Sequence, residues 1–258
     1  MPDLRLSATG LEVGDDGSRL FAFADTVLRG SGQVMFQNNS YAGLLFLVGI
    51  ACNSLVLASA ALLGTISSTL AAIALGADRQ MVRNGMFGFN GGLVGIALLY
   101  FLEPAPLVWA CVVIAAAGST IVMAAMAVAL DAARLPALTA PFVLTSLCVL
   151  LAGAHFGHLQ ASEFLPTASL PQAATVGGQV TAATLGEGLL KGIGQVFLQD
   201  SMATGALVTL GLLVASRRAC LAALAGSFAG MLVAWGMGAA EPAIRAGAFG
   251  YNGALVAI

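Results

Sequence analysis

Residues 28–34 read LRGSGQV, and residues 190–196 read LKGIGQV. Farther along the chain, FGFNGGLV begins at Phe87 and FGYNGALV begins at Phe249. Both pairs of segments lie 162 residues apart, and no gap is needed to align them. Similarity that recurs at one fixed offset indicates an internal duplication, which decides how the rest of the chain is divided.

The composition is that of a membrane protein. Hydrophobic residues make up 59% of the 258 residues and charged residues only 9%, with a mean hydropathy of +0.94. An average soluble domain carries about 25% charged residues. The net charge of −2 provides no basic surface, so we exclude nucleic acid as a partner. In a membrane protein, a duplicated unit typically means that a transport route lies between two related halves.

The N-terminal residues lack the apolar core of a cleavable signal peptide. We interpret them as a polar or interfacial lead-in, in which residues 20–28 form either a short helix on the membrane surface or a solvated segment. The predicted organisation is a lead-in over 1–24, a first membrane repeat over 25–156, an extracytoplasmic linker over 157–186 and a second membrane repeat over 187–258.

From residue 41 onward, apolar stretches follow one another with short breaks. We expect five crossings in the first half, some of them shorter than the roughly 20 residues of a straight crossing: 41–60, 62–76, 86–101, 107–130 and 137–155. The LRGSGQVMF segment before them is too short and too rich in glycine for a sixth crossing. We interpret it as a re-entrant half-helix, which must be buried in protein or face water. The predicted fold class is therefore an all-α integral membrane protein.

An odd number of crossings means that a second copy, fused after the first, enters the membrane from the opposite side. Charge supports this inversion, because five arginines then lie together on the cytoplasmic side with the N-terminus: Arg79, Arg83, Arg134, Arg217 and Arg218. Glu103 and the linker, which lacks Lys and Arg, lie outside. Arg245 is an exception, and as the counterpart of Arg83 it is expected to have a local structural role. We predict two inverted five-helix repeats in the inner (plasma) membrane.

The second repeat is expected to be incomplete in this chain. The first unit runs to about residue 155, so an equal second unit would run to about residue 317. The sequence given stops at Ile258, within the apolar segment GYNGALVAI. We therefore expect a C-terminally truncated second repeat.

Several motifs in order give the chain a specific resemblance. LRGSGQVMFQNN, GMFGFNGGLVG and LPALTAPF follow one another in the first half, and LLKGIGQVF and FGYNGALV repeat two of them in the second. This series resembles the urea transporter family, in particular bacterial-type urea channels. The resemblance implies a channel-like facilitator of urea in the lipid bilayer, with two inverted five-helix halves, one pore per protomer and a homotrimeric assembly. It implies no enzyme activity and no cofactor.

Urea makes particular demands on a pore. It is a planar, neutral amide with one carbonyl acceptor and four N–H donors, and leaving those donors unpaired at membrane depth costs a few kcal/mol each. A row of acceptors beside a flat apolar slot meets this demand. Gln33 and Gln195 each follow a Gly-x-Gly and carry an amide. Thr139 supplies a hydroxyl, and Pro141 would leave a backbone carbonyl free in the turn beside it.

The resemblance assigns the residues of the slot and of the acceptor row. Thr139 matches a threonine of the family's pore, and Phe36, Phe89 and Leu93 match residues that line its constriction. In the second half, Leu198 replaces the aromatic of Phe36, which leaves open which side chains face one another there. The expected substrate-binding residues are Gln33, Phe36, Phe89, Leu93, Thr139, Gln195, Val196, Leu198, Tyr251 and Leu255.

Other polar residues have structural interpretations beside functional ones. Asn90 and Asn252 either satisfy backbone groups at a helix break or contact the solute. Asp25 and Glu187 are expected to be helix caps or salt-bridge partners. His155 and His158 are expected at the membrane interface. The cysteines stand singly in apolar stretches, and we interpret them as packing residues: Cys52, Cys111, Cys148 and Cys220.

Alternative functions remain open. One alternative is a channel for another small neutral solute, such as ammonia, water or a short amide, since the sequence does not determine the width of the slot. Another is a non-conducting fragment of such a channel. An ion-coupled carrier is disfavoured, because residues 41–77, 87–100 and 107–130 contain no acidic, basic or histidine side chain. An enzyme is disfavoured because the apolar segments contain no catalytic triad, carboxylate pair or metal-ligand cluster.

Overall fold

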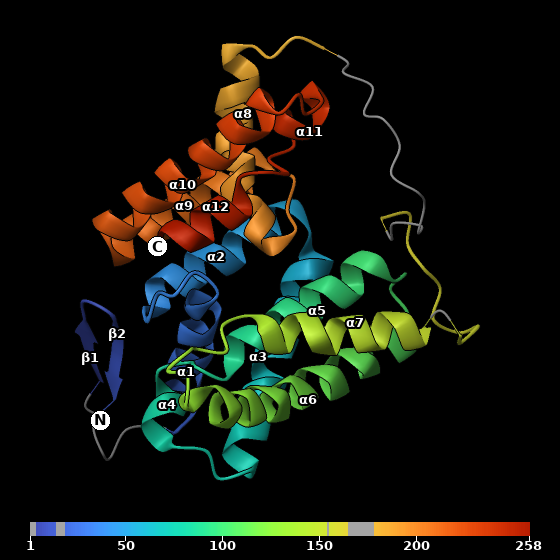
Figure 1. Ribbon diagram of the computed structural model, residues 1–258. Helices are drawn as coiled ribbons and strands as arrows, with labels where there is room; N and C mark the ends of the chain where they lie inside the picture. Colours follow the sequence, from blue (N-terminus) through green and yellow to red (C-terminus); the bar gives the residue numbers. More distant parts are fainter. Residues whose placement is uncertain (1–3, 14–18, 154, 165–177) are drawn as a thin grey trace.

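The computed structural model describes residues 4–13, 19–153, 155–164 and 178–258, and helices make up most of them (Figure 1). The seven helices of the first half, together with the hairpin that precedes them, are described first. The hairpin consists of antiparallel strands β1 (Leu4–Ser7) and β2 (Gly10–Val13). The helices are α1 (Arg19–Gln33), α2 (Ser40–Asn53), α3 (Leu55–Ala74), α4 (Arg79–Arg83), α5 (Gly88–Phe101), α6 (Pro106–Asp131) and α7 (Ala140–Gly153).

The second half repeats this order. Its elements are α8 (Ala182–Gly194), the 3-10 turn η1 (Gln195–Phe197), α9 (Met202–Ala215), α10 (Arg217–Gly236), α11 (Glu241–Arg245) and α12 (Tyr251–Ala257). Both ends of α9, α10 and α11 lie 162 residues after the corresponding ends of α2, α3 and α4. The duplication found in the sequence is therefore present in the structure over the elements from α1 to the start of α5.

The hairpin was not expected, because the N-terminal segment was interpreted as a lead-in. It is attached to the start of α2 by backbone and side-chain hydrogen bonds. The Ser40 N–H donates to the Thr9 carbonyl (3.0 Å), and the Asn39 amide donates to the Ala8 carbonyl (3.3 Å). Asn39 also accepts from the Ala42 N–H and so caps α2. The hairpin thus lies against the first helices of the chain.

Among the described residues, three helices are long and apolar enough to cross a membrane: α3, α6 and α10. A fourth crossing results if Ala182–Phe197 and Met202–Ala215, which are bent by 77° at their junction, count as one broken span. α2, α5 and α7 are apolar but have only 14 residues each. The chain is therefore a multi-pass, helical membrane protein, and all five apolar stretches expected in its first half contain a helix.

One predicted boundary is wrong. We expected the first two crossings to be separated between residues 60 and 62, but the break lies at Ser54. The Ser54 side chain accepts a hydrogen bond from the Leu57 N–H (3.2 Å) and so begins α3 there. Ser216, at the same place in the second half, caps α10 by bonding the Ala219 N–H. Hydropathy does not detect a single polar cap within a continuous apolar stretch.

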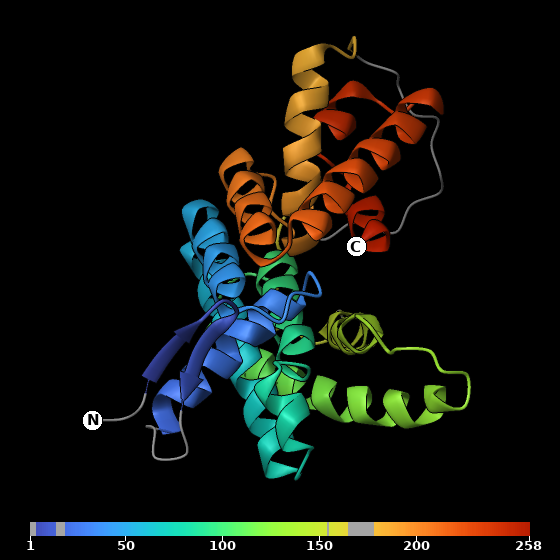
Figure 2. The same cartoon turned by 90° about the vertical axis from the view of Figure 1, so that its left-hand side faces the viewer.

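The two halves meet where α2 contacts α9, and we call this contact the α2–α9 seam (Figures 1 and 2). Gly49 of α2 packs against Thr204 and Leu207 of α9, and Gly211 of α9 packs against Ala42 and Phe46 of α2. An early residue of one helix therefore faces a late residue of the other, so α2 and α9 run in opposite directions. Gly49 and Gly211 are also equivalent in the repeat, and each provides the close approach at its own end of the seam.

Candidate functional site

The repeated segments 28–34 and 190–196 each lie at the end of a helix, and each leads into a turn of the same conformation. After α1, Phe36 has a left-handed backbone (φ 57°), and its N–H donates to the Gln33 carbonyl (3.0 Å). After η1, Leu198 has φ 56°, and its N–H donates to the Gln195 carbonyl (2.9 Å). A left-handed conformation is uncommon for residues with a side chain, so its repetition at equivalent positions indicates a turn that both halves maintain. We call these turns the first and the second turn.

The glutamines of the two turns have the same hydrogen bond. The Gln33 Nε2 donates to the Asn84 carbonyl (2.8 Å), and the Gln195 Nε2 donates to the Ala246 carbonyl (2.9 Å). Asn84 and Ala246 are themselves repeat equivalents. Because the donor end of each amide is used in this way, its carbonyl oxygen is the end available to a ligand. Within the described residues, neither the Gln33 Oε1 nor the Gln195 Oε1 accepts a hydrogen bond.

Glycines bring α1 against α2, and α8 against α9, on either side of each turn. A Cβ on Gly43 would overlap the Leu28 carbonyl, and a Cβ on Gly205 would overlap the Leu190 carbonyl. The backbones of α1 and α2, and likewise of α8 and α9, therefore touch directly. This close contact positions each turn and its glutamine.

The residues expected to form the slot lie in or against one apolar cluster. Phe89, Leu93 and Val196 are 4%, 5% and 9% exposed and belong to the buried core. Leu198, Tyr251 and Leu255 are half-buried and pack against the same core. Phe36 is the most open of the set, with 36% of its surface exposed. The structure thus brings six of these residues into or against the same core, and Phe36 is not among the residues packed there.

Asn90 connects α5 to the start of α7. Its Nδ2 donates to the Leu138 carbonyl (3.2 Å), and its Oδ1 accepts from the Phe142 N–H (3.0 Å). Asn90 is only 1% exposed. Of its two interpretations, the structure favours the satisfaction of backbone groups at a helix break. Asn252, its repeat equivalent, is exposed.

This connection corrects one expectation about the turn before Pro141. The Ala137 carbonyl, which Pro141 was expected to leave free, accepts from the Ala140 N–H (3.2 Å). The Leu138 carbonyl accepts from Asn90, and the Thr139 carbonyl accepts from the Val143 N–H (3.1 Å). A 3-10-like turn replaces the one backbone bond that Pro141 removes, and the Asn90 side chain satisfies the next carbonyl, that of Leu138. Thr139 itself is half-buried, and its hydroxyl is not bonded by any described residue.

Charged residues form ion pairs outside the apolar cluster. Asp25 pairs with Arg29 (2.6 Å), and Glu187 pairs with Arg245 (2.9 Å), so the salt-bridge interpretation of Asp25 and Glu187 is the correct one. Arg245 also pairs with Glu241 (2.8 Å). These pairs are the local structural role expected for Arg245.

Glu241 has two hydrogen-bond donors on one oxygen. The Thr184 hydroxyl donates to its Oε1 (2.7 Å), and so does Nε of Arg245 (2.8 Å). The Thr184 hydroxyl first, and Arg245 after it, lower the pKa of the Glu241 carboxyl, because both stabilise its charged form. Its partner responds in the other direction, since the hydrogen bond with Glu241 raises the pKa of Arg245.

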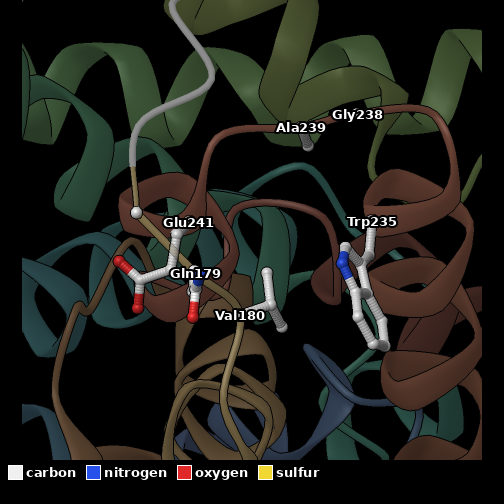
Figure 3. A pocket seen from close by; sticks show the side chains of 7 residues that line it. Gln179, Val180, Trp235, Gly238, Ala239 and Glu241 are labelled. Atoms are coloured by element: carbon white, nitrogen blue, oxygen red, sulfur yellow. The ribbon is translucent and has the colours of Figure 1, made fainter.

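A pocket of about 390 Å³ opens beside Glu241, between the end of α10 and the segment before α8 (Figure 3). Trp235 and Glu241 lie on either side of Val180 in this view. None of the residues expected to bind substrate lines this pocket: the lining residues are Gly178, Gln179, Val180, Trp235, Gly238, Ala239 and Glu241. It is therefore separate from the candidate site.

A second pair of repeated glutamines was not predicted from the sequence. Gln37 donates from Nε2 to the Met35 carbonyl (2.8 Å), and Gln199 donates from Nε2 to the Phe197 carbonyl (2.8 Å). Each side chain folds back onto its own turn and is 8% and 0% exposed, respectively. Comparison of the chain with itself at the 162-residue offset would have found this pair.

The histidines and cysteines lie apart from the candidate site. His155 and His158 are exposed. All four cysteines are free, and only Cys220 is buried. Cys220 has the burial expected of a packing residue, Cys111 is half-buried, and Cys52 and Cys148 are exposed on their helices.

Comparison with known proteins agrees with the resemblance found in the motifs. Residues 24–258 match the family model described as "Urea transporter". The match begins within α1 and continues through α12, so it includes both turns, α5 and the start of α7. Every residue of the candidate site therefore lies within the matched region.

Individual relatives carry the same description. The chain is 30% identical to urea transporter 1 of Rattus norvegicus and 31% identical to that of Mus musculus, over 240 residues and 92% of its length in both cases. It is 31% identical to urea transporter 1 of Ovis aries over 247 residues, or 94% of its length. The aligned region makes up 62% of the rat and mouse proteins and 64% of the sheep protein, so the chain spans less than two thirds of these relatives.

Proposed function

The chain belongs to the urea transporter family, and from that premise we propose that it contributes to a passive, channel-like route for urea across the membrane. One observation carries the proposal. The two turned helix ends each present a glutamine, Gln33 and Gln195, whose Nε2 is bonded to protein and whose oxygen accepts no hydrogen bond from the part of the chain that the structure describes. Two fixed acceptors on repeat-related turns suit a solute with N–H groups on both sides of one carbonyl.

We also propose that the repeats are inverted in the membrane. The opposite directions of α2 and α9, and the equivalence of Gly49 and Gly211 across the seam, support a two-fold relation between the halves. If α2 crosses the membrane, an axis of that kind lies in the membrane plane. The repeats would then comprise residues 25–156 and 187–258, joined by an extracytoplasmic linker over 157–186. Acceptors from both turns would lie along one route.

Within this route, the proposed roles divide by chemistry. Gln33, Gln195 and the Thr139 hydroxyl accept hydrogen bonds from urea as its water is removed. The remaining residues present apolar surface to its flat faces, and they are Phe36, Phe89, Leu93, Val196, Leu198, Tyr251 and Leu255. The placement of all but Phe36 in or against one apolar cluster supports this division.

The cellular setting is also a proposal. The distribution of arginines over the loops favours a cytoplasmic N-terminus in the inner, or plasma, membrane. The homotrimer that the family resemblance implies would give one route per subunit. We therefore propose urea as the permeant, the lipid bilayer as the surroundings and three copies of the chain as the assembly.

Urea flux into liposomes tests the proposed function. We expect the protein to equilibrate urea down its gradient at a rate that does not change when proton and sodium gradients are abolished, because the apolar helices carry no group suited to coupling. Water and ammonia fluxes measured on the same vesicles separate the alternative solutes. A urea flux that disappears with the ion gradients would contradict the channel mechanism, and a flux of water or ammonia without urea would favour the alternatives.

Thr139→Val is expected to lower urea flux about tenfold, since one lost hydrogen bond to a desolvated solute costs on the order of 1–3 kcal/mol. Thr145→Val is the matched control, because it makes the same isosteric change on α7 where the hydroxyl is buried without a partner. Flux per reconstituted protein and thermal stability in detergent would be measured for both. Equal flux in the two variants would remove Thr139 from the route.

Gln33 requires a different comparison, because its amide also ties the first turn to Asn84. Gln33→Leu removes both the oxygen and this tie. Gln195→Leu is its repeat-related partner, and we expect each substitution to lower flux by a similar factor. A loss of stability without a loss of flux per folded protein would make these glutamines structural only.

A further inference from the structure

The α2–α9 seam is hydrogen-bonded at one of its two ends. The Asn53 Nδ2 donates to Gln199 Oε1 (2.8 Å), and the Thr204 hydroxyl donates to the Gly49 carbonyl (2.7 Å). Both bonds join the C-terminal end of α2 to the second turn and to the start of α9. Phe46 adds an aromatic contact there with Phe197, with ring centroids 5.5 Å apart.

The repeat provides an internal comparison for these bonds. At the other end of the seam, the positions equivalent to Asn53 and Thr204 are Ala215 and Ala42. An alanine side chain has no donor, so neither bond has a counterpart beside the first turn. Within the described residues, the Gln37 Oε1 accepts no hydrogen bond, whereas the Oε1 of its repeat equivalent, Gln199, accepts one from Asn53. The two turns therefore resemble each other internally but are held by different contacts, because the first turn is bonded within its own half, by Arg29 through Asn38 (2.8 Å) and by the hairpin through Asn39 (3.3 Å).

The bond from Asn53 acts on the second turn through Gln199. Gln199 is fully buried, and its Nε2 donates to the carbonyls of Phe197 (2.8 Å) and Leu198 (3.2 Å). With both ends of the amide bonded, Gln199 cannot rotate without breaking a bond to the turn or to α2. A buried amide oxygen that loses its donor is costly, so removal of Asn53 would favour movement of the turn.

We infer that Asn53 is a positioning residue that fixes the second turn against α2, so that this edge of the route is held across the seam from the other half of the chain. This inference rests on the proposed function for the identity of the route, but the tether itself does not depend on urea. Leu198 would then present a constant surface to the solute. Phe36 lies in a turn that is held within its own half instead, by Arg29 and by the hairpin.

Hydrogen–deuterium exchange of the purified chain in lipid nanodiscs tests the tether directly. Asn53→Ala should speed exchange over 195–201 about fivefold and leave 33–39 unchanged, since it removes one hydrogen bond from local opening. Ala215→Asn should slow exchange over 33–39 by supplying the missing donor. Exchange over 195–201 that does not respond to Asn53→Ala would overturn the inference.

The ratio of urea to N-methylurea permeability gives the second readout. Loss of folded channels lowers both permeabilities by the same factor, whereas a displaced edge changes their ratio. We expect Asn53→Ala to change this ratio about threefold in favour of the larger solute. An unchanged ratio in a urea-conducting protein would overturn the positioning role. If the unaltered protein conducts no urea, the proposed function fails, while the exchange experiment still decides whether Asn53 holds the second turn.

Discussion

Gly43→Ala should prevent the chain from folding stably in the membrane. The added Cβ would overlap the Leu28 carbonyl, which belongs to the backbone of α1 and is not free to rotate away. Overpacking of this kind costs about 3 kcal/mol when backbones must separate, a large fraction of the roughly 5–15 kcal/mol by which proteins are stable. Separation of α1 from α2 would also displace the first turn and Gln33. Thermal unfolding and monodispersity in detergent would measure the loss.

Gly118→Ala is the matched control for this prediction. Gly118 lies within α6, and a Cβ placed there meets no atom within 4 Å. The same chemical change should therefore be neutral, or stabilising by about 0.5–1 kcal/mol, because alanine favours the helix. Gly205→Ala, at the position equivalent to Gly43, should be as damaging as Gly43→Ala. If Gly43→Ala and Gly118→Ala unfold at the same temperature, the close contact between α1 and α2 does not limit stability.

Much of the fold follows from the sequence because the duplication is a strong and simple signal. The offset of 162 residues predicted two related units, and it recurs in the bounds of α9, α10 and α11 relative to the first half. Hydropathy located the apolar helices, although it misplaced the end of α2. Hydropathy averages over many residues, whereas the break at Ser54 depends on one side chain and the N–H of Leu57.

The candidate site was predictable in part. Gln33 and Gln195 were identified from their repeated motif, and the structure gives them equivalent hydrogen bonds. Their use of Nε2 toward Asn84 and Ala246 was not predictable, since it depends on which loop each turn meets after folding. Solute binding by these residues remains a proposal.

The Asn53–Gln199 bond was not predictable from the sequence for a related reason. The two residues are 146 positions apart and are not repeat equivalents, so neither motif nor offset connects them. Their contact follows from the opposite directions of α2 and α9. Once that packing is known, the alanine at position 215 becomes informative, because it marks where the symmetry of the repeat is broken.

Asn90→Ala should destabilise the first half by about 2 kcal/mol, because it removes two hydrogen bonds in a site that excludes water. The Phe142 N–H and the Leu138 carbonyl would both lose their Asn90 partner at the start of α7. Thr139 lies between these two backbone groups in the chain, so the loss should also lower urea flux per folded protein. Thermal unfolding and liposome flux would be measured together.

Asn252→Ala separates this effect from the general effect of losing an asparagine. Asn252 occupies the equivalent position at the start of α12 and is exposed, so its substitution should change stability by less than about 0.5 kcal/mol. Asn90→Asp adds a further test, because it keeps an acceptor for Phe142 but loses the donor to Leu138 and buries a charge. It should therefore be no more stable than Asn90→Ala. If Asn90→Ala and Asn252→Ala have the same small effect, α7 is held in place by its apolar contacts with α5 and α6, and Thr139 does not depend on Asn90 for its position.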